Sequence, residues 1–216
     1  MIALIFDMDG VIVDSNAMHR ESWTAFNRRY GLETTEAMHQ RMYGRRNDQI
    51  LRDFYGDEMT VEEVDARGQA KERLDREMMA GRTEELLVPG LRAFLERHRD
   101  LPMGVASNAA PESVALVLEE TGLRPYFRAV VDGHQVHSPK PHPELYLRAA
   151  ELLETEPADC IVFEDSHSGA AAAVAAGMRV IGLCTTYVNL PGTILTIDNF
   201  LSRDLEPWLQ AQMRRF

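Results

Sequence analysis

The feature that most constrains the fold is an alternation of short apolar runs and helical stretches that begins near residue 89. Continuous apolar strands that alternate with helices are typical of a parallel sheet covered by helices on both faces. We therefore predict an α/β fold with a doubly wound, Rossmann-like parallel sheet. The expected strands are residues 2–6, 103–106, 129–131, 160–163, 179–183 and 193–197, and the expected helices are residues 91–99, 111–121, 143–153, 168–176 and 205–214.

A segment of different texture separates the first expected strand from the others. It is rich in charged residues and Met, and Trp23, Phe26 and Tyr30 recur at helical steps. This pattern predicts a helical cap that is inserted after the first strand and could open for a substrate and close to exclude water. We expect residues 1–15 and 88–216 to form the catalytic core and residues 16–87 to form the cap.

The charge balance and the cysteines limit the possible partners and location. The 216 residues include 34 acidic and 23 basic side chains, and the net charge of −11 argues against nucleic-acid or anionic-membrane binding. No stretch is long enough to span a bilayer, and the first apolar run stops at Asp7, too early for a signal peptide. Cys160 and Cys184 lack a metal-binding spacing and fit free thiols. We expect a cytoplasmic monomer without nucleic-acid or membrane partners.

Two carboxylates follow the first expected strand. Asp7 and Asp9 are two residues apart and lead into Gly10, which allows a sharp turn. Alternate side chains of an extended segment point the same way, so both carboxylates would face one spot. Such a pair is costly unless a cation or a shared proton relieves the repulsion, which suits a metal-assisted nucleophile beside an acid/base. Considered alone, the motif fits an Asp-rich turn equally well.

Two further strand ends are expected at the same edge of the sheet. Ser107 and Asn108 follow a strand and precede a helix, where a hydroxyl and backbone amides can bind phosphate. A helix N-cap is the alternative for Ser107. Lys140 lies between Pro139 and Pro141, which restrict the backbone around one ammonium group. It could neutralise a carboxylate and a phosphoryl oxygen, or lie in a stiff solvated loop.

Adjacent acids end a third strand. Glu164 and Asp165 offer the hard oxygen ligands that Mg²⁺ prefers. Glu164 either ligates the ion or orients its waters. The alternative for Asp165 is an N-cap of the following helix. Together with the first two aspartates, these residues form a candidate magnesium site.

The motifs occur in a characteristic order. The sequence Asp7-Met-Asp9-Gly10-Val11, then Ser107, Lys140-Pro141-x-Pro143 and Glu164-Asp165, resembles the four motifs of the haloacid dehalogenase-like phosphohydrolases. Within that superfamily, the chain resembles the β-phosphoglucomutase-like proteins and sugar-phosphate phosphatases, which have a helical cap after the first strand. The resemblance covers essentially the whole chain.

The resemblance implies a mechanism. Asp7 would attack phosphorus and become an aspartyl phosphate, and Asp9 would protonate the leaving alcohol and then activate water. This role requires nearby anions to raise the pKa of Asp9. Mg²⁺ would bind Asp7, the backbone carbonyl of Asp9 and Asp165, with Glu164 beside them. Lys140 and Ser107 would help to stabilise the transition-state charge.

Specificity is expected on the cap and hinge. In this sequence, Asn47 and Ala109 stand where the mutases have an arginine for a distal phosphate and a second serine. Both differences favour a phosphatase acting on a small phosphorylated metabolite, a sugar phosphate by resemblance. A phosphoglucomutase-type enzyme and, less favoured, a non-catalytic protein on the same fold are the alternatives. Lys71 and Arg73 fit an amphipathic charged face. The candidate substrate-binding residues are Ser107, Asn108, Lys140, His19, Gly44, Arg45, Arg46 and Asn47.

Overall fold

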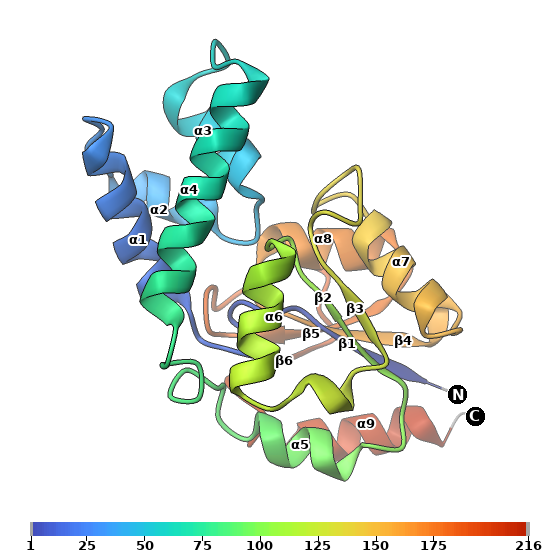
Figure 1. Cartoon of the computed structure of the whole chain (residues 1–216). Helices are drawn as coiled ribbons and strands as arrows, with labels where there is room; N and C mark the ends of the chain where they lie inside the picture. The colour runs from blue at the N-terminus through green and yellow to red at the C-terminus, as the bar shows by residue number, and fades with distance from the viewer. Residues whose placement is uncertain (1, 215–216) are drawn as a thin grey trace.

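A parallel sheet forms the centre of the molecule. The computed structural model describes residues 2–214, and in them six strands form one sheet in the order β3-β2-β1-β4-β5-β6 (Figure 1). Every pairing is parallel, and Leu4 of β1 lies opposite Met103 on one side and Ile161 on the other. The predicted fold class is confirmed. The strands are β1 (Ala3–Phe6), β2 (Met103–Ala106), β3 (Ala129–Val131), β4 (Cys160–Glu164), β5 (Arg179–Leu183) and β6 (Leu195–Ile197).

Helices cover both faces of the sheet. Successive side chains of each strand point to opposite faces, and apolar side chains on both faces need to be buried. In β1, Leu4 and Phe6 join one buried apolar cluster, whereas Ala3 and Ile5 join another. Phe6 stacks on Phe163 of β4 at a ring distance of 4.8 Å. Helices α5 (Leu91–Arg97), α6 (Pro111–Glu120) and α9 (Leu205–Met213) contribute to the first cluster, and α7 (Glu144–Leu152) and α8 (His167–Ala175) to the second. Short 3₁₀ turns occur at η1 (Arg124–Tyr126) and η2 (Pro157–Asp159).

The helical insertion has an apolar cluster of its own. Trp23, Phe26, Ile50 and Leu51 are buried there, and Trp23 and Phe26 pack edge to face. The insertion stands to one side of the sheet in Figure 1. Its helices are α1 (Asn16–Arg29), α2 (Glu36–Met42), α3 (Asn47–Tyr55) and α4 (Val61–Met79). No helix within residues 2–214 is long and apolar enough to cross a membrane.

Two connecting segments, near Asp14 and near Leu87, join the cap to the core. The amide of Asp14 donates to the carbonyl of Leu86 at 2.7 Å, and the amide of Val88 donates to the carbonyl of Ile12 at 3.0 Å. Between these bonds, Val13 forms an antiparallel bridge with Leu87. The two connecting segments therefore lie beside residues 16 and 87, at which we expect the cap to begin and end. The division of the chain into core and cap stays a prediction.

Candidate active site

A cavity of about 80 Å³ lies between the carboxyl ends of the strands and the cap. Ligands of open parallel sheets bind at this edge. Most of the residues singled out in the sequence share its wall, whereas Glu164 lies beneath it and Arg46 lines a neighbouring cavity of about 660 Å³. The expected residues that line the first cavity are Asp7, Asp9, His19, Gly44, Arg45, Asn47, Ser107, Asn108, Lys140 and Asp165.

A buried ammonium group joins two carboxylates at the floor of this cavity. Lys140 Nζ lies 2.9 Å from Asp7 Oδ1 and 2.7 Å from Glu164 Oε1, and all three side chains are almost inaccessible to solvent. Burial alone would lower the pKa of Lys140, but the charges of Asp7 and Glu164 outweigh it and raise the pKa. The lysine is therefore a fixed positive charge beside Asp7. The alternative that Lys140 lies in a solvated loop is therefore wrong.

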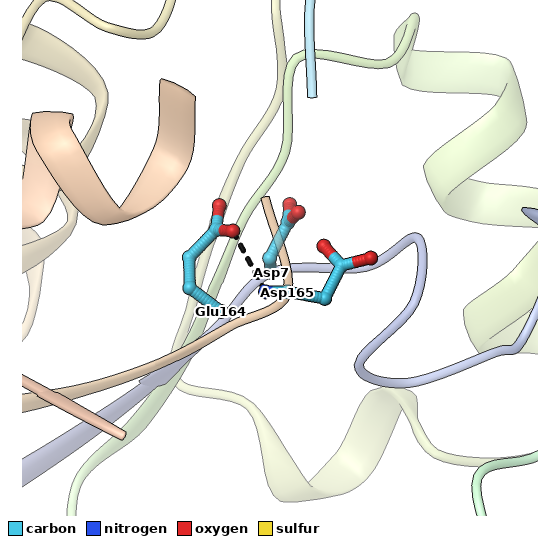
Figure 2. A group of neighbouring side chains, drawn as sticks. All are labelled: Asp7, Glu164 and Asp165. Atoms are coloured by element: carbon cyan, nitrogen blue, oxygen red, sulfur yellow. Dashed lines mark hydrogen bonds between the residues drawn. The ribbon is translucent and has the colours of Figure 1, made fainter. Parts of the chain in front are cut away.

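The carboxylate of Glu164 is fully engaged. Its Oε1 accepts from Lys140 and from Tyr146 Oη at 2.9 Å, and its Oε2 accepts from the amides of Asp165 and Ser166 and from Ser166 Oγ. Figure 2 shows the bond to the Asp165 amide, which turns the chain at the strand end. With five donors, Glu164 is suited to fixing Lys140 and the loop after β4. Its expected contact with a metal ion stays a prediction.

Asp165 is buried opposite Gly10. It accepts a short hydrogen bond from Thr186, and Thr185 Oγ1 donates to the carbonyl of Gly10 at 2.6 Å. Gly10 has φ +76°, and a Cβ there would lie 1.8 Å from Asp165 Oδ2. Only glycine therefore fits this turn. Burial, followed by the charges of Glu164 and Asp7, raises the pKa of Asp165 well above its ordinary value.

The charges of this cluster fit a divalent cation. Oxygen atoms of Asp7, Glu164 and Asp165 lie within 4.8 Å of one another (Figure 2). Lys140 offsets one of the three negative charges, so two remain uncompensated in a buried site. Burial raises the pKa of Asp7 to about 8, which shows how poorly the protein alone supports its ionised form. A hard ion with oxygen ligands would balance this charge, as expected for Mg²⁺.

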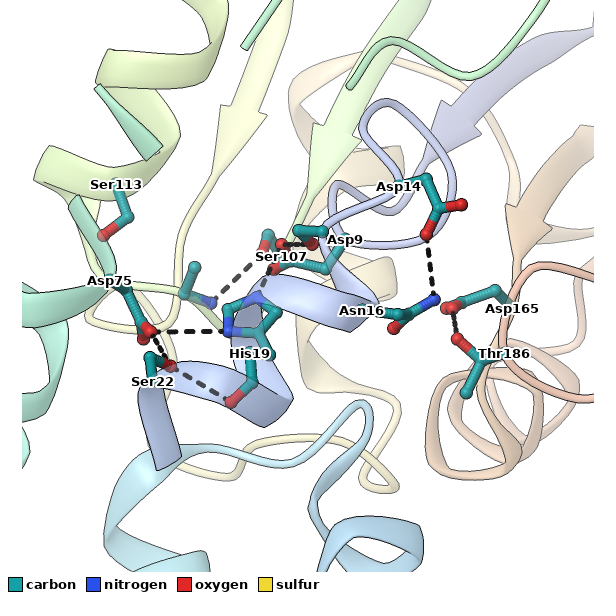
Figure 3. Close-up of polar contacts among 12 residues, drawn as sticks. Asp9, Asp14, Asn16, His19, Ser22, Asp75, Ser107, Ser113, Asp165 and Thr186 are labelled. Atoms are coloured by element: carbon teal, nitrogen blue, oxygen red, sulfur yellow. Dashed lines mark hydrogen bonds and ion pairs between the residues drawn. The ribbon is translucent and has the colours of Figure 1, made fainter. Parts of the chain in front are cut away.

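Asp9 lies apart from that cluster and faces the cap. Its Oδ1 accepts from Ser15 Oγ at 2.6 Å and from His19 Nε2 at 3.0 Å (Figure 3). Burial acts to raise the pKa of Asp9, but His19 and the hydroxyl of Ser15 outweigh burial and lower it. The expectation that nearby anions raise this pKa is therefore wrong, because the nearest charged group is a cation. Asp9 is an anion in this arrangement.

His19, the cation beside Asp9, is held by Asp75, a cap residue that was not identified from the sequence. His19 Nδ1 lies 3.6 Å from Asp75 Oδ1, and Asp75 forms an ion pair with Lys71 at 2.6 Å. Burial lowers the pKa of His19, but Asp9 and then Asp75 raise it to about 10. Although burial raises it, Lys71 and His19 hold the pKa of Asp75 well below its ordinary value.

Lys71 is the centre of this buried part of the cap. Its side chain has no exposed surface, and its ammonium lies 4.6 Å from the ring centre of Trp23. The prediction that Lys71 belongs to a solvated charged face is therefore wrong, whereas Arg73 is exposed. The spacing of four residues between Lys71 and Asp75 was the only signal in the sequence for this pair.

Ser107 and Asn108 follow β2 beside Asp7 and Lys140, and Asn108 contacts the cap. Ser107 is buried, and its Oγ accepts from the amide of Ala109 at 3.1 Å. Asn108 Nδ2 donates to the carbonyl of Gly44 at 3.0 Å, and Ser168 Oγ donates to the same carbonyl at 2.9 Å. Gly44 therefore docks the cap on the loop after β2 and on the first turn of α8. Its contact with a substrate stays a prediction.

The cap arginines are held by protein groups. Arg45 Nη1 lies 3.0 Å from Asp53 Oδ2 and also donates to the carbonyl of Arg41. Arg46 forms two hydrogen bonds with Asp48, at 2.9 and 2.7 Å. Neither guanidinium is presented to the cavity without a protein anion, so their expected roles in substrate binding stay predictions.

The four sequence motifs thus meet at one cavity, with a cation and buried acids as a phosphohydrolase requires. Residues 1–177 match the family model "haloacid dehalogenase-like hydrolase". The chain belongs to this family.

Individual relatives cover most of the chain. It is 33% identical over 181 residues to fructose-1-phosphate phosphatase YqaB of Escherichia coli, covering 82% of this chain and 94% of that protein. It is 34% identical over 190 residues to a phosphorylated carbohydrates phosphatase of Thermotoga maritima, covering 85% of each. The fold is that of a β-phosphoglucomutase from Clostridium difficile, with a TM-score of 0.87, 24% identity and coverage of 100% and 98%. A helical cap after the first strand is thus part of a known arrangement.

Proposed function

We propose that the protein is a Mg²⁺-dependent phosphatase that hydrolyses a small phosphorylated carbohydrate. The observation that carries this proposal is the buried group of Asp7, Lys140 and Asp165 at the floor of one cavity. Such a group is suited to an anionic, tetrahedral ligand together with a divalent ion. Relatives named as phosphatases of phosphorylated carbohydrates support the substrate class.

Asp7 is the nucleophile in this proposal. Its carboxylate attacks phosphorus, the bond to the leaving oxygen breaks, and an aspartyl phosphate forms. Lys140 stays within 2.9 Å of this carboxylate and offsets charge on the phosphoryl oxygens, and Ser107 contributes a hydroxyl to the same corner. Asp7, the backbone carbonyl of Asp9 and Asp165 would hold Mg²⁺, which supplies Lewis-acid stabilisation of phosphoryl charge when bound.

The pair of Asp9 and His19 supplies the acid and the base. We assign the proton that this pair shares to the imidazole, because Asp9 and Asp75 raise the pKa of His19 to about 10 despite its burial. Both contacts of Asp9 engage Oδ1, so Oδ2 is the oxygen that meets the substrate. The proton moves through Asp9 to the leaving alcohol, and Asp9 then accepts a proton from the attacking water. Transfer within the pair reconciles an acid role with the low pKa of Asp9.

Hydrolysis is favoured over a phosphomutase reaction. A mutase needs a cation for the distal phosphate of a bisphosphate, and Asn47 at the corresponding position donates to Glu72 Oε1 at 2.8 Å. Arg45 and Arg46 are paired with Asp53 and Asp48. None of Arg45, Arg46 and Asn47 therefore offers an unpaired cation for a second phosphate.

Phosphate release tests the proposal. We expect release from sugar phosphates and from p-nitrophenyl phosphate in the presence of Mg²⁺, and loss of at least 99% of it with a chelator, since the buried charge is then uncompensated. Asp7→Asn removes the nucleophile and should abolish turnover, whereas Asp100→Asn, an exposed control, should not change it. Chelator-resistant release would refute the metal role, and an active Asp7→Asn enzyme would refute the nucleophile.

A further inference from the structure

A second carboxylate faces the cavity from the cap. Glu72 of α4 accepts from Asn47 Nδ2 and from Ser113 Oγ, each at 2.8 Å, so both of its oxygens are held in place. Ser113 belongs to α6 of the core, and Figure 3 shows it well separated from Asp165. Glu72 therefore lies at the end of the site away from the phosphoryl corner.

Glu72 stands where two cavities meet. The cavity of about 80 Å³ at Asp7 and the neighbouring cavity of about 660 Å³ share Asn47, Glu72, Arg76 and Asn108 as lining residues. The two cavities are therefore continuous at these four residues. A leaving group that points from Asp7 toward the larger cavity would pass Glu72 and Arg76.

Neither of these two charged groups is neutralised by a direct ion pair. Among residues 2–214, no salt bridge within 4.0 Å includes Glu72 or Arg76, and Arg76 Nη1 makes only a long contact of 3.5 Å with Ser113 Oγ. Glu72 is half-buried, and burial raises its pKa, as does Asp75. Ser113, Lys71 and His19 act in the opposite direction and lower this pKa. Each oxygen of Glu72 accepts one protein hydrogen bond, so each can still accept another from a ligand.

We propose that Glu72 and Arg76 recognise hydroxyl groups on the non-phosphorylated end of the substrate. This inference rests on the proposed phosphatase function and adds the chemistry of the leaving group. A carboxylate accepts hydrogen bonds from hydroxyls and a guanidinium donates them, so the pair fits a neutral polyol. A second phosphate at this end would lie against Glu72 and near Asp75. Glu72 thus selects a sugar or polyol monophosphate over a bisphosphate.

Three substrates separate recognition from chemistry. Fructose 1-phosphate has hydroxyls at the far end, fructose 1,6-bisphosphate has a second phosphate there, and p-nitrophenyl phosphate has neither. For Glu72→Gln we expect kcat/KM to fall about tenfold more on fructose 1-phosphate than on p-nitrophenyl phosphate, mainly through KM. Use of the bisphosphate relative to the monophosphate should rise at least fivefold, because a negative charge is removed.

Three further variants make the result specific. Glu77→Gln, on the exposed side of the same helix, should leave all three kcat/KM values unchanged. Ser113→Ala frees one oxygen of Glu72 and should give the same order of substrate effects as Glu72→Gln with smaller factors, because Asn47 still holds the other oxygen. Arg76→Gln should lower use of the monophosphate and lower use of the bisphosphate further, which gives a second test if Glu72→Gln does not fold.

The outcomes that would overturn the inference differ from failure of the proposed function. Equal effects of Glu72→Gln on all three substrates would assign Glu72 to cap docking alone and refute hydroxyl recognition. No effect on any of them would refute it as well. If the wild-type protein releases phosphate from no ester, including p-nitrophenyl phosphate, the proposed function itself falls, and this inference falls with it.

Discussion

The buried ion pair of the cap allows stability and activity to be separated. Lys71 Nζ lies 2.6 Å from Asp75 Oδ2, and the two side chains are 0% and 8% exposed. Asp75 also accepts from Ser22 Oγ at 2.5 Å and lies beside His19. Asp75→Asn therefore strands a buried ammonium, whereas Lys71→Met leaves the carboxylate with two partners. We expect the first substitution to be the more harmful.

The magnitudes follow from this asymmetry. Removing one member of a buried pair costs about 3–5 kcal/mol of unfolding free energy, which we expect for Asp75→Asn. Lys71→Met should cost about 1–2 kcal/mol, because Ser22 and His19 still bind Asp75 and Met can pack on Trp23. The double variant has no charge at positions 71 and 75, and its unfolding free energy should lie within about 2 kcal/mol of the wild-type value. The single losses sum to about 4–7 kcal/mol, so the coupling between the two sites is about 2–7 kcal/mol.

Urea unfolding and turnover together provide the assay. Trp23 lies against Lys71 in the cap, so a Trp208→Phe background leaves its fluorescence as a reporter of the cap. We expect the double variant to regain stability but to keep a kcat about tenfold below the wild type, because His19 has lost Asp75 and is held by Asp9 alone. Additive losses of stability would refute the ion-pair argument. Full recovery of kcat would refute a role of Asp75 in positioning His19.

Two other predictions concern the cap residues Gly44 and His19. Gly44 has φ +70°, and a Cβ there would lie 2.2 Å from Ser166 Oγ, so Gly44→Ala should lower kcat/KM about tenfold or more by displacing the docked loop, and wild-type kinetics would contradict this. The pKa of His19 is about 10 in the folded protein against an ordinary 6.5, so its stabilisation is complete below about pH 6.5 and is lost as the pH rises to 10. Urea midpoints from pH 6 to pH 10 should show the wild type losing about 1–3 kcal/mol of its advantage over His19→Asn, and a constant difference would count against the pairing with Asp9.

The core was predictable because its signals are local. Each expected strand is present, with ends that shift by up to two residues, such as β6 at Leu195–Ile197 where residues 193–197 were expected. Continuous apolar runs could only be strands buried on both faces, and the polar residues that follow them had to meet at one edge. The meeting of Asp7, Lys140 and Asp165 follows from that topology alone.

The cap was predictable only as a set of helices. Its surface faces and buried faces both contain charged residues, so the burial of Lys71 and Asp75 left no apolar pattern to read. The bond between Glu72 and Ser113 joins residues 41 positions apart in the sequence, on two separate parts of the fold. Contacts of this kind depend on how the cap is oriented on the core. For the same reason, the low pKa of Asp9 could not be inferred from its motif, since its cause is a cap histidine.

The two ends of the site therefore depend on different parts of the chain. The groups that meet the phosphoryl end, Asp7, Lys140 and Asp165, belong to the core and hold one another. The group that must move a proton, Asp9, belongs to the core but is bound by a cap residue. Opening the cap would separate Asp9 from His19 and its proton, while the phosphoryl corner stays intact. In the proposed mechanism, we therefore expect proton transfer to the leaving group only when the cap is closed.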